Sequence, residues 1–321
     1  MVMRKDPNQP LILAWNTLYN EKIWLVKPNS CPYKCNLTYD RSKESQASLI
    51  MFHARNTRSF DLPRSNAPRI FFSIEPPWLS YLSHGSLPSD YFNYTMTYKR
   101  NSDARMIYQP RWPKYFNLSD EKLDEIIAKK TKLALVASSH CQVESKRTEM
   151  VKHLQKFMEI TTLGKCFNNK QACKDGCFNK LMESHFFYLA FENAICPEYA
   201  TEKFTRFVNF IVPVVFRRSV IPKEYPQDIF IAMDDFKNTE EFVAYLKMVA
   251  FNKELYKRYL KWSQRPKPKN AVEPEELTCQ LCRLAHLQPH KISNYKEDHS
   301  PKECDQKFVP EWIKRNEENE T

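Results

Sequence analysis

Glycine is scarce in this chain, with only 3 residues in 321. A dinucleotide fingerprint of the form G-x-G-x-x-G and a phosphate-binding P-loop both need glycines at fixed spacing, and neither motif is present. Any nucleotide site in this protein must therefore hold phosphate with helix termini and side chains instead of a glycine-rich loop.

Long apolar runs are also missing. The best run near the amino terminus, Leu11 to Trp15, has five residues, against about 20 for a helix that spans a bilayer. A signal-peptide pattern is absent as well. We therefore expect no membrane contact within this sequence.

Charge of one sign is not concentrated in any segment. The 49 Lys and Arg residues exceed the 38 Asp and Glu residues, which gives a net charge of +11. Such a charge is compatible with nucleic-acid binding, which would show a steep salt dependence. The basic residues are scattered among acidic ones, without a clustered arm. The pattern favours a basic surface or a small anionic ligand, and no nucleic-acid partner.

The chain is rich in apolar residues, at 42% hydrophobic and 13% aromatic, which supports packed cores. Its most informative stretch runs from His185 to Phe216. An apolar run, Phe186 to Phe191, predicts a buried strand, and Val212 to Val215 predicts another. Between them, helical spacing is shown by Phe204, Phe207, Val208 and Ile211. The stretch predicts a strand, a loop, a helix and a strand, with a ligand at the carboxyl end of the first strand.

The residues of that loop suit a phosphate. Thr201 is a candidate helix N-cap, which would place Glu202 and Lys203 in the first turn. Free N–H groups, the helix dipole and an ammonium would then converge on one point. A carboxylate would repel phosphate, so we expect Glu202 to accept hydrogen bonds from a sugar or base. The alternative is that both residues only decorate a solvated helix start, and spacing alone does not decide between the two.

Together, FYLAFEN, YATEKF and VPVV resemble the donor-binding signature of the α1,3/4-fucosyltransferases, glycosyltransferase family 10. Tyr188 to Asn193, Tyr199, Thr201 to Lys203 and Val212 to Val215 follow the family pattern in order. The resemblance implies GDP-fucose as donor substrate. It also implies that Lys203 contacts the diphosphate, while Asn193, Tyr199 and Glu202 hold the nucleoside and fucose.

A second candidate lies in RIFFSIEPP, where Glu75 follows a predicted strand, Ile70 to Phe72. A carboxylate at the rim of a sheet can be desolvated enough to act as a general base. A glutamate before two prolines is also a common turn residue. The position resembles the E-S-P segment of the family, with Pro76 in place of serine, and this implies that Glu75 is the catalytic base.

The predicted strand Lys132 to Ser139 is followed by a loop and a helix. Ser138, Ser139 and Cys141, with Arg147 downstream, resemble the S-N-C stretch and the arginine that contacts the donor diphosphate in the family. His140 replaces the asparagine, and we interpret it as a loop residue. An arginine in a first helical turn is usually just exposed, so the role of Arg147 in donor binding is implied by the resemblance.

Other positions depart from the family. FNYTMTYKRNSD resembles its FNWTMSYRRDSD, but Asn101 stands where an aspartate is usual, and the expected Tyr-Gly is missing after Arg105. Phe216 follows VPVV where the family usually has glycine, which would crowd a donor pocket. These departures keep open a second hypothesis, a relative that binds glycan or nucleotide-sugar without turnover.

The chain has ten cysteines, and N-glycosylation sequons occur at Asn36, Asn93, Asn117 and Asn319. Together these features favour an oxidising, glycosylating compartment. Cys279 and Cys282 with His286 and His290 have the spacing of zinc ligands. TCQLCRLAH also resembles the carboxyl-terminal cysteine pair of the family, which implies disulfides from Cys279 and Cys282 to Cys31 and Cys35, in either order. We favour disulfides.

Alternating strands and helices predict two doubly wound α/β sheets, and the resemblance implies a GT-B type fold with two Rossmann-like domains across a cleft. We expect an amino-terminal acceptor-side domain at residues 11–115 and a linker at 116–131. We expect a GDP-fucose-binding domain at 132–265 and a cysteine-bearing tail at 266–321 that packs on the first domain.

The function implied by the resemblance is an inverting α1,3-fucosyltransferase that acts on a GlcNAc-containing glycan of an oligosaccharide or glycoprotein. Asp234 and Asp235 suggest a divalent metal but match a V-D-D-F segment that is not a metal site in the family. We therefore expect no required metal and no cofactor. The family consists of Golgi type II membrane proteins, so we expect a Golgi location through an anchor that this sequence lacks.

Overall fold

The computed structural model of the chain describes residues 9–17, 21–22, 31–57, 61–81, 87–108, 117–167, 173, 177–265, 274–287 and 292–318. The chain divides into two compact units, each made of two segments. Unit 1 comprises residues 1–107 and 272–304, and unit 2 comprises 108–271 and 305–321. Among the described residues, no helix is long and apolar enough to cross a membrane.

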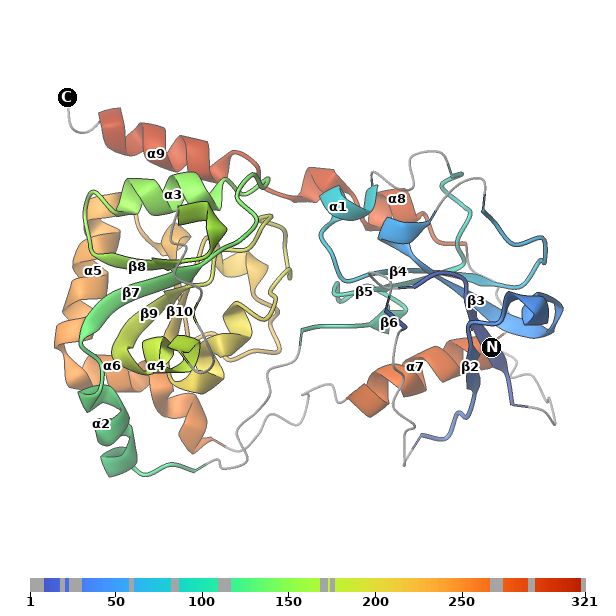
Figure 1. Cartoon of the computed structure of the whole chain (residues 1–321), viewed down its shortest axis with the longest axis horizontal. Coiled ribbons are helices and arrows are strands. Elements are labelled where there is room, and N and C mark those ends of the chain that lie inside the picture. The colour runs from blue at the N-terminus through green and yellow to red at the C-terminus, as the bar shows by residue number, and fades with distance from the viewer. Residues whose placement is uncertain are drawn as a thin grey trace. The chain divides into compact units, whose positions relative to one another are not determined.

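Unit 1 is built on a six-stranded parallel sheet with the order β2-β1-β3-β4-β5-β6 (Figure 1). The strands are β1 (Leu11–Ala14), β2 (Asn36–Thr38), β3 (Ala47–His53), β4 (Arg69–Ser73), β5 (Tyr94–Thr97) and β6 (Ala104–Arg105). The apolar runs predicted for β1, β3 and β4 form strands because a parallel sheet covered on both faces buries every position.

Alternate residues of these strands feed two cores. Ile12, Leu49 and Ile70 point to one face, where they join Leu281 and Ala285 of α7 (Pro274–His286). The neighbouring strand positions Leu13, Ile50 and Phe71 point to the other face, where they join Tyr295 of α8 (Tyr295–Asp298). Each core of unit 1 therefore needs a helix that follows the whole of residues 108–271 in the chain.

Two disulfides fasten α7 to the start of unit 1. Cys31 is bonded to Cys279 and Cys35 to Cys282. The disulfides implied by the resemblance are confirmed, and the structure decides their order. The zinc alternative is wrong for Cys279 and Cys282, because a cysteine in a disulfide has no thiolate to offer a metal.

Unit 2 is built on a five-stranded parallel sheet with the order β11-β10-β9-β7-β8. The strands are β7 (Lys132–Ala137), β8 (Ile160–Leu163), β9 (His185–Leu189), β10 (Val212–Val215) and β11 (Ile231–Ala232). Counted from its own first strand, this order is 2-1-3-4-5, which is also the order of the first five strands in unit 1. Both units thus have the doubly wound topology that the sequence predicts.

The remaining helices surround these sheets (Figure 1). They are α1 (Pro77–Tyr81), α2 (Asp120–Ala128), α3 (Arg147–Leu154), α4 (Cys177–Ser184), α5 (Thr239–Phe251), α6 (Lys253–Leu260) and α9 (Phe308–Glu318). The predicted Ser119 cap of α2 is confirmed, since its hydroxyl accepts the N–H of Lys122. Helix α2 packs on α6, and α9 packs on α3.

The division into units differs in two places from the expected domains. Residues 116–131, which we interpreted as a linker, lie in unit 2, because the buried Lys257 ammonium of α6 pairs with Asp124 of α2 at 2.6 Å. Residues 305–321 also lie in unit 2, where Trp312 of α9 is buried and donates to Thr239. The domain boundaries stay a prediction.

The strand order has a consequence for ligand binding. The crossover from the first strand to the second runs one way along each sheet, and the crossover from the third strand to the fourth runs the other way. The loops after the first and third strands therefore diverge at the carboxyl ends of these strands, which is where ligands bind in open α/β sheets. In unit 2 this point lies between β7 and β9, and in unit 1 between β1 and β3.

The two disulfides to α7 should not act additively. With one intact, the second closes only a short loop, so the pair Cys35→Ser and Cys282→Ser should cost roughly 2 kcal/mol, as should Cys31→Ser and Cys279→Ser. Removing all four cysteines opens a loop of 248 residues, and we expect a loss of roughly 7 kcal/mol from loop-closure entropy. Urea unfolding in oxidising buffer measures these free energies. Additive losses would contradict the shared-loop argument.

Candidate functional site

The loops at the switch point of unit 2 hold all five residues predicted for the donor. Arg147 begins α3 after the β7 loop, while Asn193, Tyr199, Glu202 and Lys203 lie in the loop between β9 and β10. The two loops are joined, because the N–H of Ser145 donates to the carbonyl of Asn193 at 3.0 Å. The hydroxyl of Ser145 donates to the carbonyl of Glu192 at 2.6 Å.

The centre of this site is Glu192, which is not among the residues predicted for the donor. Its residue is 3% exposed. One carboxylate oxygen accepts the Thr201 N–H at 2.7 Å, and both oxygens lie 2.8 Å from the Thr201 hydroxyl. The second oxygen lies 3.2 Å from the Lys203 ammonium. The available signal in the sequence is a charged residue directly after the apolar run Phe186 to Phe191.

The helix predicted to start at Thr201 does not form, and this part of the prediction was wrong. Only a short 3₁₀ segment, Phe204–Asn209, is present, with Lys203 at its cap position and no side-chain capping bond. The Glu192 carboxylate accepts hydrogen bonds from the Thr201 N–H and from the Thr201 hydroxyl. Phe204 and Phe207 are both buried, so their spacing in the sequence resembles that of an α-helix although none forms. Positive charge in this site therefore comes from side chains and not from a helix terminus.

Lys203 is held on several sides. Its ammonium lies 3.2 Å from Glu192 and 3.0 Å from Glu202, and donates to the Thr201 hydroxyl at 3.1 Å. Burial works to lower the pKa of Lys203, but the Glu192 and Glu202 carboxylates outweigh it and raise that pKa. Burial works to raise the pKa of Glu202, but Lys203 outweighs it and lowers that pKa. Both groups are therefore charged throughout the neutral range.

Arg147 is a buried cation of a different kind. It is 4% exposed, and its guanidinium donates to the carbonyls of Phe191 at 3.1 Å and His140 at 3.0 Å. Within the described parts of the chain, its Nε–H has no hydrogen-bond partner, and no carboxylate lies within 4.0 Å of the guanidinium. Burial lowers the pKa of Arg147, and the Glu192 charge works against that shift.

Burying a cation without a contacting carboxylate is costly unless an anion arrives to compensate it. The positive charge of Arg147 works against the rise in the pKa of Lys203 that the carboxylates cause. Two cations on neighbouring segments at a topological switch point form an environment suited to a multiply charged anion.

The loops around Arg147 are braced against the edge of the sheet. A disulfide joins Cys141 to Cys166, and the N–H of Ser138 donates to the carbonyl of Leu163 at 2.9 Å. Gly164 has a φ of +96°, and a Cβ placed there would lie 2.2 Å from the Ser138 carbonyl oxygen. Glycine is therefore required for the loops after β7 and β8 to pack this closely.

Glu75 lies in unit 1, in a bend between β4 and α1. It is half-buried, and the Ser73 hydroxyl accepts its N–H at 3.2 Å while donating to its carbonyl at 3.1 Å. These bonds fix the backbone of Glu75 and do not involve its carboxylate. As predicted from the strand, Glu75 stands at the carboxyl edge of the sheet in unit 1.

Phe216 belongs to the core of unit 2. Its ring stacks on Phe191 with centroids 4.1 Å apart and meets the edge of Phe308 at 5.9 Å. Its residue is 2% exposed. The Phe216 side chain, which we expected to crowd a donor pocket, thus packs in the core against α9.

Asp234 and Asp235 form an ion pair and a hydrogen bond with a neighbouring arginine. Asp235 pairs with Arg218, and Asp234 accepts the N–H of Arg218 at 2.9 Å. Among the described residues, no group of three or more His, Cys, Asp or Glu side chains is arranged to hold a metal ion.

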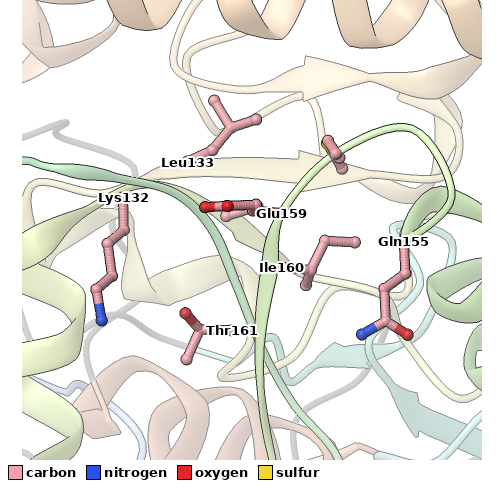
Figure 2. Close-up of a pocket in the computed structure, with 8 residues that line it drawn as sticks. Lys132, Leu133, Gln155, Glu159, Ile160 and Thr161 are labelled. Atoms are coloured by element: carbon pink, nitrogen blue, oxygen red, sulfur yellow. The ribbon is translucent and has the colours of Figure 1, made fainter.

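A separate hollow lies at the opposite end of the same sheet. Figure 2 shows Lys132, Leu133, Gln155, Glu159, Ile160 and Thr161 around it, and its volume is about 480 Å³. Its walls include the amino ends of β7 and β8, whereas the Arg147 and Lys203 site lies at their carboxyl ends. None of the predicted donor residues lines this hollow.

Comparison with known proteins assigns both halves of the chain. A model described as glycosyltransferase family 10 (fucosyltransferase) C-term matches residues 127–300, and one described as fucosyltransferase, N-terminal, matches residues 7–109. The α-(1,3)-fucosyltransferase fut-5 of Caenorhabditis elegans is 32% identical over 303 residues, covering 87% of this chain and 79% of that protein. The α-(1,3)-fucosyltransferase fut-1 of the same organism is 30% identical, covering 88% of this chain and 66% of that protein.

Solved structures are similar in fold. A crystal structure of an α1,3-fucosyltransferase with GDP superposes with a TM-score of 0.58 at 16% identity, covering 90% of this chain and 94% of that one. Another, with GDP-fucose, gives a TM-score of 0.55 at 15% identity, covering 91% and 96%. The GT-B type α/β fold expected from the resemblance is confirmed.

Gly164→Ala should be strongly destabilising, because it adds backbone strain and a steric clash with the Ser138 carbonyl. We expect a loss of roughly 2–4 kcal/mol in the free energy of unfolding. The matched control is Lys165→Ala at the exposed neighbouring residue, which should stay within about 0.5 kcal/mol of the unmodified protein. Chemical denaturation measures both, and equal stability of the two variants would refute the close-packing argument.

Proposed function

Because the chain is a glycosyltransferase that belongs to family 10, the fucosyltransferases, we propose that it is an inverting α1,3-fucosyltransferase. The donor is GDP-fucose, and the acceptor is a GlcNAc-containing glycan on an oligosaccharide or glycoprotein. The donor proposal is supported by relatives named as α-(1,3)-fucosyltransferases and by fold neighbours bound to GDP and GDP-fucose.

The observation that carries the proposal is that two cations, Arg147 and Lys203, stand on segments that the hydrogen bonds of Ser145 join. Arg147 is a buried guanidinium without a contacting carboxylate among the described residues, and Lys203 is an ammonium whose charge is secured by Glu192. A diphosphate would supply the contacting anion that Arg147 lacks, and charge-assisted bonds from Arg and Lys to phosphate are among the strongest in proteins.

In the proposed reaction, an acceptor hydroxyl attacks the anomeric carbon of fucose while the bond from that carbon to the diphosphate oxygen breaks. Glu75 takes the proton of the attacking hydroxyl as general base. The bonding electron pair leaves on the β-phosphate of GDP, where Arg147 and Lys203 stabilise the growing negative charge. Attack from the face opposite the leaving group inverts the anomeric configuration.

The other donor residues take the parts of the substrate that carry no net charge. Asn193, Tyr199 and Glu202 offer amide, hydroxyl and carboxylate groups that can bond to the nucleoside and to fucose hydroxyls. Two cationic side chains compensate the diphosphate, so the reaction we propose requires no metal. The proposed location is the Golgi lumen.

A relative that binds nucleotide-sugar without turnover remains the alternative, favoured by Asn101 in place of the usual aspartate. The second argument for it, crowding by Phe216, loses force because that ring is packed between Phe191 and Phe308. Transfer itself distinguishes the two hypotheses.

Labelled GDP-fucose and a mixed array of GlcNAc-containing glycans test the transferase directly. Glu75→Gln should lower kcat by about 100-fold or more, because the attacking hydroxyl keeps its proton, while GDP affinity stays unchanged. Lys203→Ala should weaken GDP binding as well as turnover. Asp90→Asn and Lys152→Ala, at exposed residues of units 1 and 2, serve as controls for charge and should retain activity.

Two outcomes would count against these assignments. GDP binding without transfer by the unmodified protein would favour the non-catalytic relative. Transfer that survives Glu75→Gln would remove Glu75 as the base.

The sequons should differ in occupancy if the chain is made in a glycosylating compartment. Asn36 and Asn117 are exposed, so we expect glycans there. The side-chain carbonyl of Asn93 accepts the N–H of Arg69 at 2.9 Å beside the sheet, which holds its amide inside the fold, and we expect no glycan. Asn319 lies outside the described residues. Mass spectrometry of the chain secreted from cultured cells measures occupancy, and a glycan on Asn93 with bare Asn36 and Asn117 would contradict this reasoning.

A further inference from the structure

The ammonium of Lys203 has no spare donor. An ammonium carries three N–H groups, and three acceptors surround this one: Glu192 at 3.2 Å, Glu202 at 3.0 Å and the Thr201 hydroxyl at 3.1 Å. A diphosphate oxygen can therefore bond to Lys203 only by replacing one of them.

The three acceptors are not equally replaceable. The Glu192 side chain is 4% exposed and is held by the Thr201 N–H and hydroxyl, so separating it from Lys203 would leave a buried carboxylate with less compensation. The Thr201 hydroxyl is tied to Glu192 in turn. The Glu202 side chain is 58% exposed, and releasing an exposed carboxylate into water costs little.

We propose that the two carboxylates on Lys203 have different functions: Glu192 is a permanent anchor that positions Lys203, and Glu202 is a placeholder that the donor diphosphate displaces. This inference rests on the proposed function above, in which Lys203 binds the diphosphate of GDP-fucose. Glu192 acts through Lys203 and Thr201 and is a positioning residue. Glu202, once released, is free to accept hydrogen bonds from donor hydroxyl groups.

The exchange explains how the site remains stable without a ligand. With Glu202 in place, the two carboxylates and the two cations Arg147 and Lys203 sum to no net charge. When the diphosphate replaces Glu202, the Lys203 ammonium still has Glu192 as a fixed partner, which keeps it protonated and in position. In the empty site, the placeholder occupies the position on the Lys203 ammonium that the diphosphate would take.

Two hypotheses for the Glu192 carboxylate, repulsion of phosphate and positioning of Lys203, predict opposite effects of Glu192→Gln on anion affinity. If both carboxylates acted only by repelling phosphate, Glu192→Gln and Glu202→Gln would both strengthen anion binding. If Glu192 is the anchor, its replacement loosens the Thr201 to Lys203 turn and weakens binding. The two substitutions remove the same charge, so the sign of the effect separates the hypotheses.

The experiment is calorimetric titration of the full chain with pyrophosphate and with GDP. Removing the exposed competitor in Glu202→Gln should tighten pyrophosphate binding about threefold. Glu192→Gln should weaken it about tenfold or more, through the loss of charge-assisted hydrogen bonds. Glu149→Gln, at an exposed residue of α3, removes a charge without touching Lys203 and should leave affinity within about twofold.

GDP affinity measured over a pH series adds a second test. If Glu192 had only a structural role, Glu192→Gln would not change the pH at which GDP affinity falls. In the unmodified protein the pKa of Lys203 is raised, because the carboxylates outweigh burial. The ammonium therefore stays charged until the pH exceeds its usual 10.5. Without the Glu192 charge, burial has less opposition, so GDP affinity in Glu192→Gln should fall off at lower pH than in the unmodified protein.

Each outcome decides a separate point. Weaker pyrophosphate binding by Glu202→Gln would overturn the placeholder role of Glu202. Because Glu202 is exposed, this variant tests that role even if Glu192→Gln does not fold. Tighter binding by Glu192→Gln would overturn the anchor. If the unmodified protein binds neither pyrophosphate nor GDP, the proposed donor site itself fails, which is a different result from normal binding with the wrong response to the variants.

Discussion

A carboxylate removed from water must be compensated where it lies, and the organisation of unit 2 around Glu192 follows from that constraint. The residue sits at the end of β9, and its compensation comes from Thr201 and Lys203, about ten residues further along the chain. The connection from β9 to β10 is thereby folded back on itself. The folded-back connection forms a short 3₁₀ segment, Phe204–Asn209, in place of the expected α-helix.

The same constraint brings the cations together. The hydroxyl and N–H of Ser145 bind the carbonyls of Glu192 and Asn193, which ties the β7 loop to the β9 loop. Arg147 follows two residues later and donates to the carbonyl of Phe191. Buried hydrogen bonds of this kind rigidify a loop that would otherwise be mobile. The proposed anion site consequently depends on a network of backbone carbonyls and one buried carboxylate, and among the described residues a glycine is required at Gly164.

Much of the architecture could be predicted because it depends on local pattern. The apolar runs at Leu11, Leu49, Ile70 and Lys132 became strands, and Ser119 became a helix cap. The spacing of Phe204, Phe207 and Ile211 gave a wrong helix, since a short 3₁₀ segment and a buried loop present apolar residues at similar intervals. The disulfide partners of Cys279 and Cys282 came from family resemblance, and their order came from the structure.

The sequence by itself determined the chemistry available: a chain nearly free of glycine, with family motifs that supply Glu75, Arg147, Asn193, Tyr199, Glu202 and Lys203. Residue type and order are local properties, so they can be read directly. Only the tertiary structure decided which charges meet. Glu192 and Lys203 are eleven residues apart, and Arg147 and Phe191 are forty-four apart. Whether such groups touch depends on strand order and burial, which no local pattern encodes.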